Sequence, residues 1–389
     1  MSNSMRTITR ACLAIALGIP VPALSLAASA TDAVELIKTP DGGIQPQAIV
    51  DNAGTLHLIY YKGDPESGDI FYVHRNLKNG GPFTAPIRVN SVPHSAIAIG
   101  TIRGAQIAAH GNRVYVTWNG VKPKDADGAS PMYPAFTRLN AVTGRFEPQR
   151  NLLTSPGGVD GGGTVAADGQ GSVYVMWHVS PPGKDEAAGG IVMRKSRDFG
   201  KTFGPEKVIS TKPTGQCGCC SMRAMAGSGH SVYVLYRAAD ANVRRDTTLL
   251  ASVDAGATFR QSEVMDWEIN TCPMSSFSLS ESKQGTIGAW ERMGQVYASA
   301  ISPSGCVGKI LEAPGTGSRK YPVAVRNARG EMLLTWVEGS GWARGGSLKW
   351  QRYDTQGEPE GSAGTQEGVP AWSLETAVVR PDGRYMIFY

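Results

Sequence analysis

The stretch Gly169-Gln-Gly171 followed by Val173-Tyr-Val-Met-Trp177 decides the fold, because it joins a glycine turn to a short alternating strand that ends in an aromatic residue. Apolar residues at period two are typical of a strand, and a glycine turn between two such runs is typical of a hairpin. Similar strands follow turns at Leu56–Tyr60, Val114–Trp118, Val232–Tyr236, Ile287–Trp290, Met332–Trp336 and Tyr385–Tyr389. Their spacing of about 45 to 60 residues is in the range of four-stranded propeller blades.

The repeated hairpins predict an all-β chain folded as a β-propeller. Each hairpin needs a neighbouring sheet to cover its apolar face, and radial stacking supplies that cover while leaving few free strand edges. Seven hairpins favour seven blades, and six blades is the alternative. The last hairpin ends at Tyr389 without room for outer strands, so we expect residues 33–38 to complete its blade and to close the ring.

Composition excludes several other classes of protein. With 48 Gly and 24 Pro among 389 residues and only 18% charged residues, the chain does not fit a coiled coil or a long helical bundle. The formal net charge is +5, and no basic run is long enough to follow a phosphate backbone. We therefore expect no nucleic-acid partner.

Residues 1–30 have the pattern of a secretory signal peptide. Arg6 and Arg10 precede an apolar run over residues 11–19, and Ala28-Ser29-Ala30 offers the small residues before a cleavage site. That run is too short to span a membrane, and no later stretch reaches 18 uninterrupted apolar residues. We expect a periplasmic or secreted protein, cleaved near Ala30, in which residues 31–389 form one domain.

Two copies of a sharper motif lie in adjacent repeats. They share the spacing Ser-x-Asp-x-Gly-x-Thr-Phe and comprise Ser196, Asp198, Gly200, Thr202 and Phe203 in the first copy and Ser252, Asp254, Gly256, Thr258 and Phe259 in the second. An Asp carboxylate in such a turn accepts backbone amides, Gly takes a positive φ, and Phe anchors the hairpin. This motif is the Asp-box of bacterial neuraminidase repeats, and the whole chain resembles the sialidase-like propellers that carry it. Asp-boxes are scaffold, so the resemblance implies the fold more strongly than the activity.

The resemblance also implies a site to look for. Sialidases use three arginines to bind a carboxylate, a Tyr nucleophile assisted by a Glu, and an Asp acid/base. The family's first arginine stands in a Phe/Tyr-Arg-Ile-Pro motif, and here that strand reads Gly43-Ile-Gln-Pro-Gln47, so this arginine is replaced. A substitute set would use Tyr321, Glu291 and Asp160 for catalysis and Arg103, Arg237, Arg292, Arg319 and Trp372 for ligand binding.

The cysteines indicate a different site. Cys217-Gly-Cys219-Cys220 precedes one inner strand, and Cys272-Pro-Met274 precedes the next at the matching place. In a propeller such positions are neighbours around the mouth of the central channel, so four sulfurs should come together. Cys306 lies in an outer loop and is the candidate for a leftover thiol, because removal of Cys12 with the signal peptide leaves five cysteines.

Three interpretations of the cysteine cluster remain open. The first is a structural disulfide such as Cys217 to Cys272, which an exported protein could form. The second is a soft-metal site for Cu(I) or Zn(II), with Cys217, Cys219, Cys220, Cys272 and Met274 as ligands. The third is thiol–disulfide exchange through a vicinal Cys219–Cys220 bond. We expect a propeller that binds a small ligand, a glycan or a metal at this mouth, with an exo-glycosidase as the alternative and a protein partner on a propeller face as a further possibility.

Overall fold

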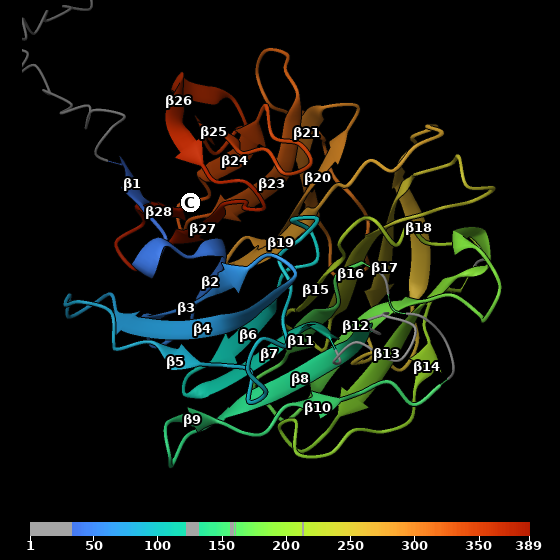
Figure 1. The fold of residues 1–389 in the computed structure, drawn as a ribbon. Helices are drawn as coiled ribbons and strands as arrows, with labels where there is room; N and C mark the ends of the chain where they lie inside the picture. The colour runs from blue at the N-terminus through green and yellow to red at the C-terminus, as the bar shows by residue number, and fades with distance from the viewer. Residues whose placement is uncertain (1–32, 122–131, 156–158, 160, 212–213) are drawn as a thin grey trace, which may run out of the picture.

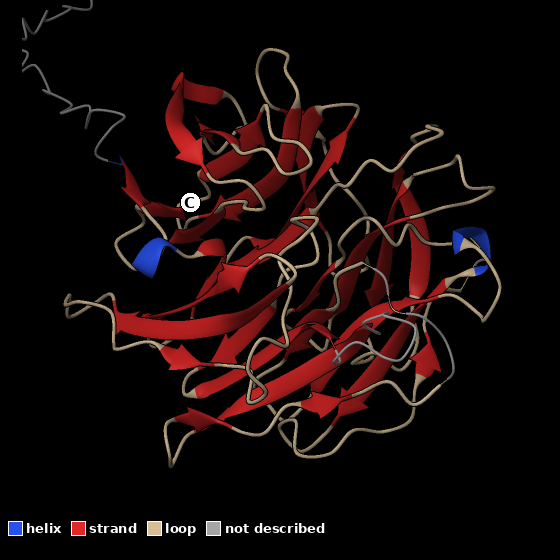
Figure 2. Cartoon of the chain, in the orientation of Figure 1, coloured by secondary structure: helices blue, strands red, loops and turns tan. Residues whose placement is uncertain are grey.

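The protein folds into seven β-sheets arranged in a ring, as Figure 1 shows for a computed structural model that describes residues 33–121, 132–155, 159, 161–211 and 214–389. The prediction of a seven-bladed all-β propeller is confirmed, and the six-blade alternative is wrong. Within these ranges the only helical segments are two single 3-10 turns, Pro40–Gly42 and Glu186–Ala188, drawn in blue in Figure 2. The predicted signal peptide lies outside the described residues.

The first three blades follow one another along the chain. Blade 1 comprises β2 (Ile44–Val50), β3 (Thr55–Asp64), β4 (Ser67–Asn76) and β5 (Ile87–Arg88). Blade 2 comprises β6 (Gln106–His110), β7 (Arg113–Val121), β8 (Met132–Asn140), β9 (Arg145–Phe146) and β10 (Arg150–Asn151). Blade 3 comprises β11 (Thr164–Ala167), β12 (Val173–Val179), β13 (Gly190–Ser196) and β14 (Lys207–Val208).

The next three blades repeat the antiparallel order. Blade 4 comprises β15 (Arg223–Ala226), β16 (Val232–Arg237), β17 (Thr247–Ser252) and β18 (Arg260–Met265). Blade 5 comprises β19 (Phe277–Ser282), β20 (Gly285–Arg292), β21 (Gln295–Ile301) and β22 (Leu311–Glu312). Blade 6 comprises β23 (Arg319–Arg326), β24 (Met332–Glu338), β25 (Gly346–Tyr353) and β26 (Pro359–Val369).

The seventh sheet draws its strands from two distant parts of the chain. The hairpin of β27 (Thr376–Val379) and β28 (Tyr385–Phe388) supplies the first two strands. The third is β1 (Val34–Ile37), which pairs with β28 in parallel, so that Leu36 lies opposite Ile387. Residues 33–38 thus lie beside the last hairpin, where the sequence predicts them.

Aromatic residues near the ends of the second strands fill the space between blades. Trp118, Trp177, Trp290 and Trp336 are all fully buried. A buried aromatic side chain removes roughly 150–250 Å² from water, so these residues are a large part of what holds neighbouring sheets together. Each apolar cluster that contains one of them joins residues of adjacent blades, such as Leu235 of β16 with Phe277 of β19.

The two Ser-x-Asp-x-Gly-x-Thr-Phe turns join the third and fourth strands of blades 3 and 4. Oδ1 of Asp198 accepts the backbone N–H of Thr202 at 2.9 Å, and Oδ2 accepts the Thr202 hydroxyl at 2.7 Å. Asp254 and Thr258 repeat both bonds at 2.8 and 2.6 Å. These hydrogen bonds hold the pKa of both carboxyls well below its usual range. The remaining motif residues close the same turns: Ser196 and Ser252 accept the N–H of Gly200 and Gly256, while Phe203 and Phe259 pack on the cores.

The first strands of the blades, here called the inner strands, surround a central channel. They are β2, β6, β11, β15, β19, β23 and β27, and the cavity between them has a volume of about 470 Å³. The end of the channel at which these strands begin is here called the mouth. No helix in the described part of the chain is long and apolar enough to cross a membrane.

Candidate metal centre

Three cysteines of the loop before β15 form a compact buried cluster. The Sγ atom of Cys217 lies 3.1 Å from that of Cys219 and 3.4 Å from that of Cys220. All three sulfurs lie within 4.8 Å of one another, and each side chain is at most 9% exposed. A tight turn brings them together, since the backbone N–H of Cys220 donates to the carbonyl of Cys217 at 3.2 Å.

The loop before β19 lies directly against this cluster. The backbone N–H of Ser275 donates to Sγ of Cys220 at 3.5 Å, and the N–H of Ser221 donates to the carbonyl of Ser275 at 3.1 Å. Cys272 is exposed and its thiol is a hydrogen-bond partner of Cys219, while Met274 packs against the three buried cysteines. Of the five residues that the sequence proposes as metal ligands, the structure gathers Cys217, Cys219 and Cys220 in one cluster and places Cys272 and Met274 at its edge.

The thiol of Cys220 differs from that of Cys217 in the direction of its pKa shift. Burial opposes ionisation of Cys220, but hydrogen bonds with Cys217 and Cys219, the charge of Arg237 and the Ser275 amide together hold its pKa well below the usual range. Hydrogen bonds with Cys219 and Cys220 instead raise the pKa of Cys217. The cluster thus favours one thiolate, at Cys220, with its two neighbours as thiols.

The five cysteines of the described chain are all free thiols. No two of them are at bonding distance within the described ranges, although the sulfurs of the cluster are close enough for a small movement to join a pair. The disulfide and thiol-exchange interpretations therefore stay predictions. Cys306 is exposed in the outer loop between β21 and β22 and does not belong to the cluster. Hydrogen bonds with Ser304, Ser302 and Arg260 lower the pKa of the Cys306 thiol.

A buried histidine beside the cluster was missed in the sequence. His178, at the mouth end of β12, is 2% exposed, and neither of its ring nitrogens has a hydrogen-bond partner among the described residues. A Cβ atom added at Gly161 would lie 2.7 Å from Nδ1 of His178 and 2.9 Å from the carbonyl oxygen of Cys220, so both groups face the same point. Burial lowers the pKa of His178 to about 3, which keeps the imidazole neutral.

The register of the second strands offers a signal that would have found His178. In blades 2 to 5, the residue directly after the buried aromatic residue of the second strand is polar. Each of these four polar residues is at most 2% exposed. They are Asn119, His178, Arg237 and Glu291. A polar residue at this repeated position is therefore an interior residue at the mouth rather than a solvated one.

The donor set fits a soft metal ion. Thiolates and thioethers are preferred by Cu(I), and zinc also accepts cysteine ligands. Zn–S bonds of about 2.3 Å at tetrahedral angles separate sulfurs by about 3.8 Å, and the observed 3.1 and 3.4 Å separations are a few tenths of an ångström shorter. The three buried sulfurs need only a small expansion to hold such an ion.

Two of the proposed ligand-binding arginines are held inside the protein. Arg237 is fully buried, stacks on Trp267 and Phe277, and donates to the carbonyls of Arg245 and Glu291. Arg319 is 4% exposed, lies over the ring of Trp336, and donates to Gln295 and to the carbonyl of Pro314. The terminal Nη1 and Nη2 atoms of both guanidinium groups already have acceptors, so a clamp that uses them requires those bonds to break.

The other two arginines lie nearer the surface. Arg292 donates to the carbonyl of Asp266 and is half-exposed at the end of β20. Arg103 lies beside Gly100, where an added Cβ would be 2.9 Å from Nη1 of Arg103 and 3.7 Å from Trp342. Trp372 packs edge-on against Trp342 with ring centroids 4.8 Å apart. Asp160 lies outside the described residues.

Tyr321 and Glu291 lie in the interior near the mouth. Tyr321 is 3% exposed and lines a cavity of only about 30 Å³, which it shares with Gln45 and Glu375. Burial raises the pKa of Tyr321, and Thr101 and Ser340 oppose that rise. One oxygen of Glu291 accepts the backbone N–H of Gly294 at 2.9 Å. Catalytic roles for Tyr321 and Glu291 stay predictions.

Several mouth residues have a strained backbone. Gln45, Thr101, Met274, Tyr321 and Trp372 have φ angles between +48° and +59°, although none of them is glycine. Such angles are uncommon for residues with a Cβ atom and persist only where the surrounding structure fixes them. Each lies shortly before or at the beginning of an inner strand, so the propeller turns its chain sharply at the mouth in at least five places.

Comparison with known proteins supports the fold. No protein-family model matches the sequence, and no curated protein matches it.

Among solved structures, the α-L-arabinanase of Penicillium chrysogenum is 10% identical over 81% of this chain and 94% of its own, with a TM-score of 0.53. The α-L-arabinofuranosidase Arb93A of Fusarium graminearum is 10% identical over 82% and 97%, with a TM-score of 0.52. A sialidase of Trypanosoma rangeli matches at 10% identity over 79% and 56%, with a TM-score of 0.46. The chain shares its propeller fold with the first two of these structures.

Proposed function

We propose that this chain is an exported soft-metal-binding propeller that holds Cu(I) between the sulfurs of Cys217, Cys219 and Cys220. The observation that carries the proposal is the mutual approach of these three sulfurs to within 4.8 Å in a buried site. Three polarizable sulfurs that approach one another this closely form a donor set that suits a soft cation.

Cys272 and Met274 complete the proposed site from the neighbouring blade. Cys272 is exposed and lies beside Cys219, so it is the sulfur that an arriving ion meets first. Met274 covers the buried sulfurs and keeps water from them. The turn fixes the three buried ligands and Cys272 is exposed to solvent, which suits a site that acquires and releases its ion.

Copper is preferred over zinc because of the number of buried ligands. A structural zinc site takes four ligands in a closed tetrahedron, whereas only three of the four cysteines of this site are buried. Bound Cu(I) would supply a closed-shell soft cation that satisfies the thiolate. The surrounding chain holds the Cys220 sulfur through the Ser275 amide and places the positive charge of Arg237 near it.

Anaerobic loading of the reduced protein tests the proposal. We expect one Cu(I) per chain in competition with a chromophoric Cu(I) chelator, and at least about tenfold weaker binding in Cys220→Ser. Cys306→Ser is the matched control, because Cys306 is exposed in a distant loop, and we expect it to bind like wild type. Sub-stoichiometric copper in the reduced wild-type protein, or equal binding by Cys220→Ser, would contradict the proposal.

Free-thiol counting by mass spectrometry distinguishes the other cysteine chemistries. Protein isolated with five free thiols and no metal would leave the cluster without a metal role, and protein isolated with three would indicate a disulfide. A mass change that reverses with mild reductant would favour thiol–disulfide exchange.

Glycoside hydrolysis is the alternative function. The arrangement that favours it is a buried tyrosine, Tyr321, that shares a cavity with the carboxyl of Glu375. The cavity of about 30 Å³ holds one or two water molecules, so a sugar ring enters only if the mouth opens. Fluorogenic sialoside and arabinofuranoside substrates test this function, and turnover that disappears in Tyr321→Phe would establish it over metal binding alone.

A further inference from the structure

The central channel contains a half-buried arginine that has no ion pair with a carboxylate of the described residues. Arg223 begins β15, and its guanidinium donates to Oε1 of Gln47 from blade 1 and, at 3.3 Å, to Oε1 of Gln106 from blade 2. Among the residues that the structure describes, no carboxylate lies within ion-pair distance of Arg223. Its partners are neutral amides, so its positive charge is solvated only in part.

The neighbouring amides are oriented to present oxygen to this arginine. Nε2 of Gln106 donates to the carbonyl of Met222 at 2.8 Å, and Oε1 also accepts the hydroxyl of Thr164 at 2.6 Å. Both glutamines are less than 10% exposed. The chain therefore builds a polar layer across the channel whose net charge is +1.

Glu375 does not supply the missing negative charge. It is fully buried in the small cavity on the mouth side of this layer, and Oε1 accepts the hydroxyl of Thr335 at 3.0 Å. Burial raises the pKa of Glu375 to about 8, so most of this carboxyl is protonated at pH 7. Desolvation also makes the Arg223 charge costly, since it lowers the pKa of the guanidinium to about 10.

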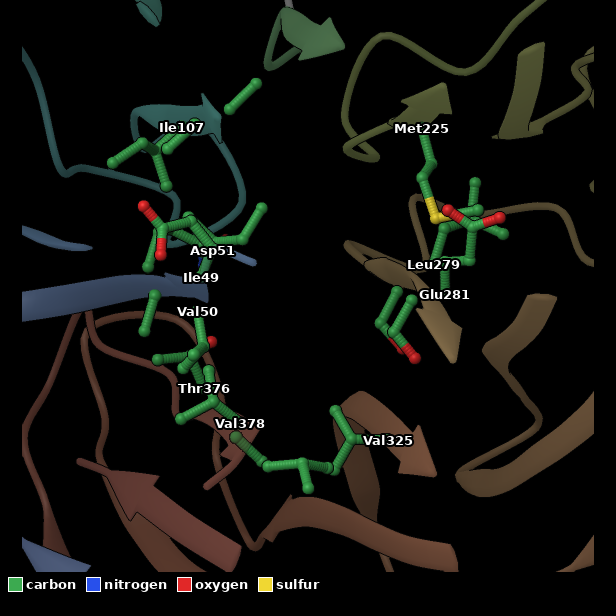
Figure 3. A pocket seen from close by; sticks show the side chains of 18 of the residues that line it. Ile49, Val50, Asp51, Ile107, Met225, Leu279, Glu281, Val325, Thr376 and Val378 are labelled. Carbon is green, nitrogen blue, oxygen red and sulfur yellow. The ribbon is translucent and has the colours of Figure 1, made fainter. Parts of the chain in front are cut away.

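Beyond the polar layer the channel is wide, and its wall combines apolar side chains with polar ones. Its cavity of about 470 Å³ is in the size range of small-molecule sites. Figure 3 shows apolar side chains from six inner strands around one opening, namely Ile49, Ile107, Met225, Leu279, Val325 and Val378. Charged groups occur again at the far end, where Asp51 accepts backbone amides of its own turn and Glu281 accepts the N–H of Ser228.

We propose that the central channel binds a small organic carboxylate, with its carboxylate on Arg223 and its apolar body among the side chains of Ile49, Met225, Leu279 and Val325. An Arg–carboxylate pair is strong when buried and hydrogen-bonded, and the apolar wall selects a ligand with a hydrocarbon body over a hydrophilic anion. The ligand enters from the end opposite the mouth, because the mouth side narrows to about 30 Å³. This site is separate from the cysteine cluster.

Calorimetric titration of the full chain with sodium octanoate, in buffer free of chloride, tests the proposal. We expect one octanoate per chain, with 1-octanol and butyrate at least tenfold weaker, because the first lacks the charge and the second lacks the apolar body. Octanoate that does not bind, or that binds no more tightly than 1-octanol, overturns the proposal.

Substitutions then locate the carboxylate. Arg223→Gln should weaken octanoate at least tenfold while leaving 1-octanol within about twofold. Arg326→Gln is the matched control at the far end of the same cavity and should change octanoate by no more than about twofold. Loss of octanoate in Arg326→Gln with retention in Arg223→Gln overturns the assignment.

A second variant keeps the test valid where Arg223→Gln does not fold. Val378→Phe fills the apolar part of the channel and keeps Arg223, so octanoate binding should be lost. Chloride needs only the charge of Arg223, so any rise in melting temperature that chloride gives the wild-type protein should persist in Val378→Phe. Chloride that protects wild type fully, together with octanoate that adds nothing, identifies a site for inorganic anions and overturns the proposal of an organic carboxylate.

Discussion

The backbone N–H of Ser275 donates to the Sγ atom of Cys220 at 3.5 Å, which joins the loop before β19 to the loop before β15. The bond lies between adjacent blades and places Cys272 beside Cys219. We infer that the cysteine cluster is a property of two blades together. Its chemistry is therefore best probed in the intact propeller.

Accessibility predicts two classes of cysteine. In brief alkylation of the native reduced protein, we expect Cys272 and Cys306 to be modified and Cys217, Cys219 and Cys220 to react only after denaturation, because the first two are exposed and the others are buried. Peptide mass spectrometry measures each site. If Cu(I) uses Cys272, loading slows alkylation of Cys272 and leaves Cys306 unchanged, whereas equal slowing at both would indicate a general effect on the protein.

Replacement of Arg237 should destabilise the fold strongly. Arg237→Leu leaves several buried acceptors without a donor, including the carbonyls of Arg245 and Glu291, so we expect the free energy of unfolding to fall by about 3 kcal/mol. Arg292→Leu, at the rim, should cost only about 0.5 kcal/mol. Urea unfolding compares the two variants. Similar small losses would show that Arg237 is not a structural residue.

Glu375 should make stability depend on pH in the neutral range. Its pKa is about 8 in the folded protein and near 4.5 when unfolded, so the folded state holds the extra proton between these values. Stability is full below about pH 4.5 and falls as the pH rises toward 8. In Glu375→Gln this decline should be absent. Urea midpoints for both proteins across this range test the sign, and parallel curves would contradict it.

The two turn carboxylates should have the opposite effect in acid. The pKa values of Asp198 and Asp254 are lowered in the folded protein, so their contribution is present above their ordinary value of 3.8 and is lost as the pH falls below it. We expect wild type to lose more stability between pH 6 and pH 3 than the double variant Asp198→Asn/Asp254→Asn. Chemical denaturation at both pH values measures the difference, and an equal loss in both proteins would refute it.

The fold was predictable because its signals are local and repeated. A glycine turn, an alternating strand and a closing aromatic such as Trp177 or Trp290 specify each hairpin, and stacking of hairpins follows from their apolar faces. The proximity of Cys219 and Cys272 was predictable for the same reason, since matching positions of adjacent blades are neighbours.

The roles of individual polar side chains were not predictable in this way. A strand-end arginine looks the same in sequence whether it is solvated or, like Arg237, stacked between Trp267 and Phe277. His178 and Arg223 were missed because their surroundings come from several blades. Burial of a polar group depends on contacts far apart in the chain, and spacing within one repeat does not contain them.

The layer formed by Gln47, Arg223 and Gln106 crosses the axis of the ring and divides its interior into two chambers. The cysteine cluster and the proposed carboxylate site lie on opposite sides of this layer, so two ligands can occupy the ring at once. The rise in melting temperature caused by copper and the rise caused by octanoate should therefore be additive when both ligands are present.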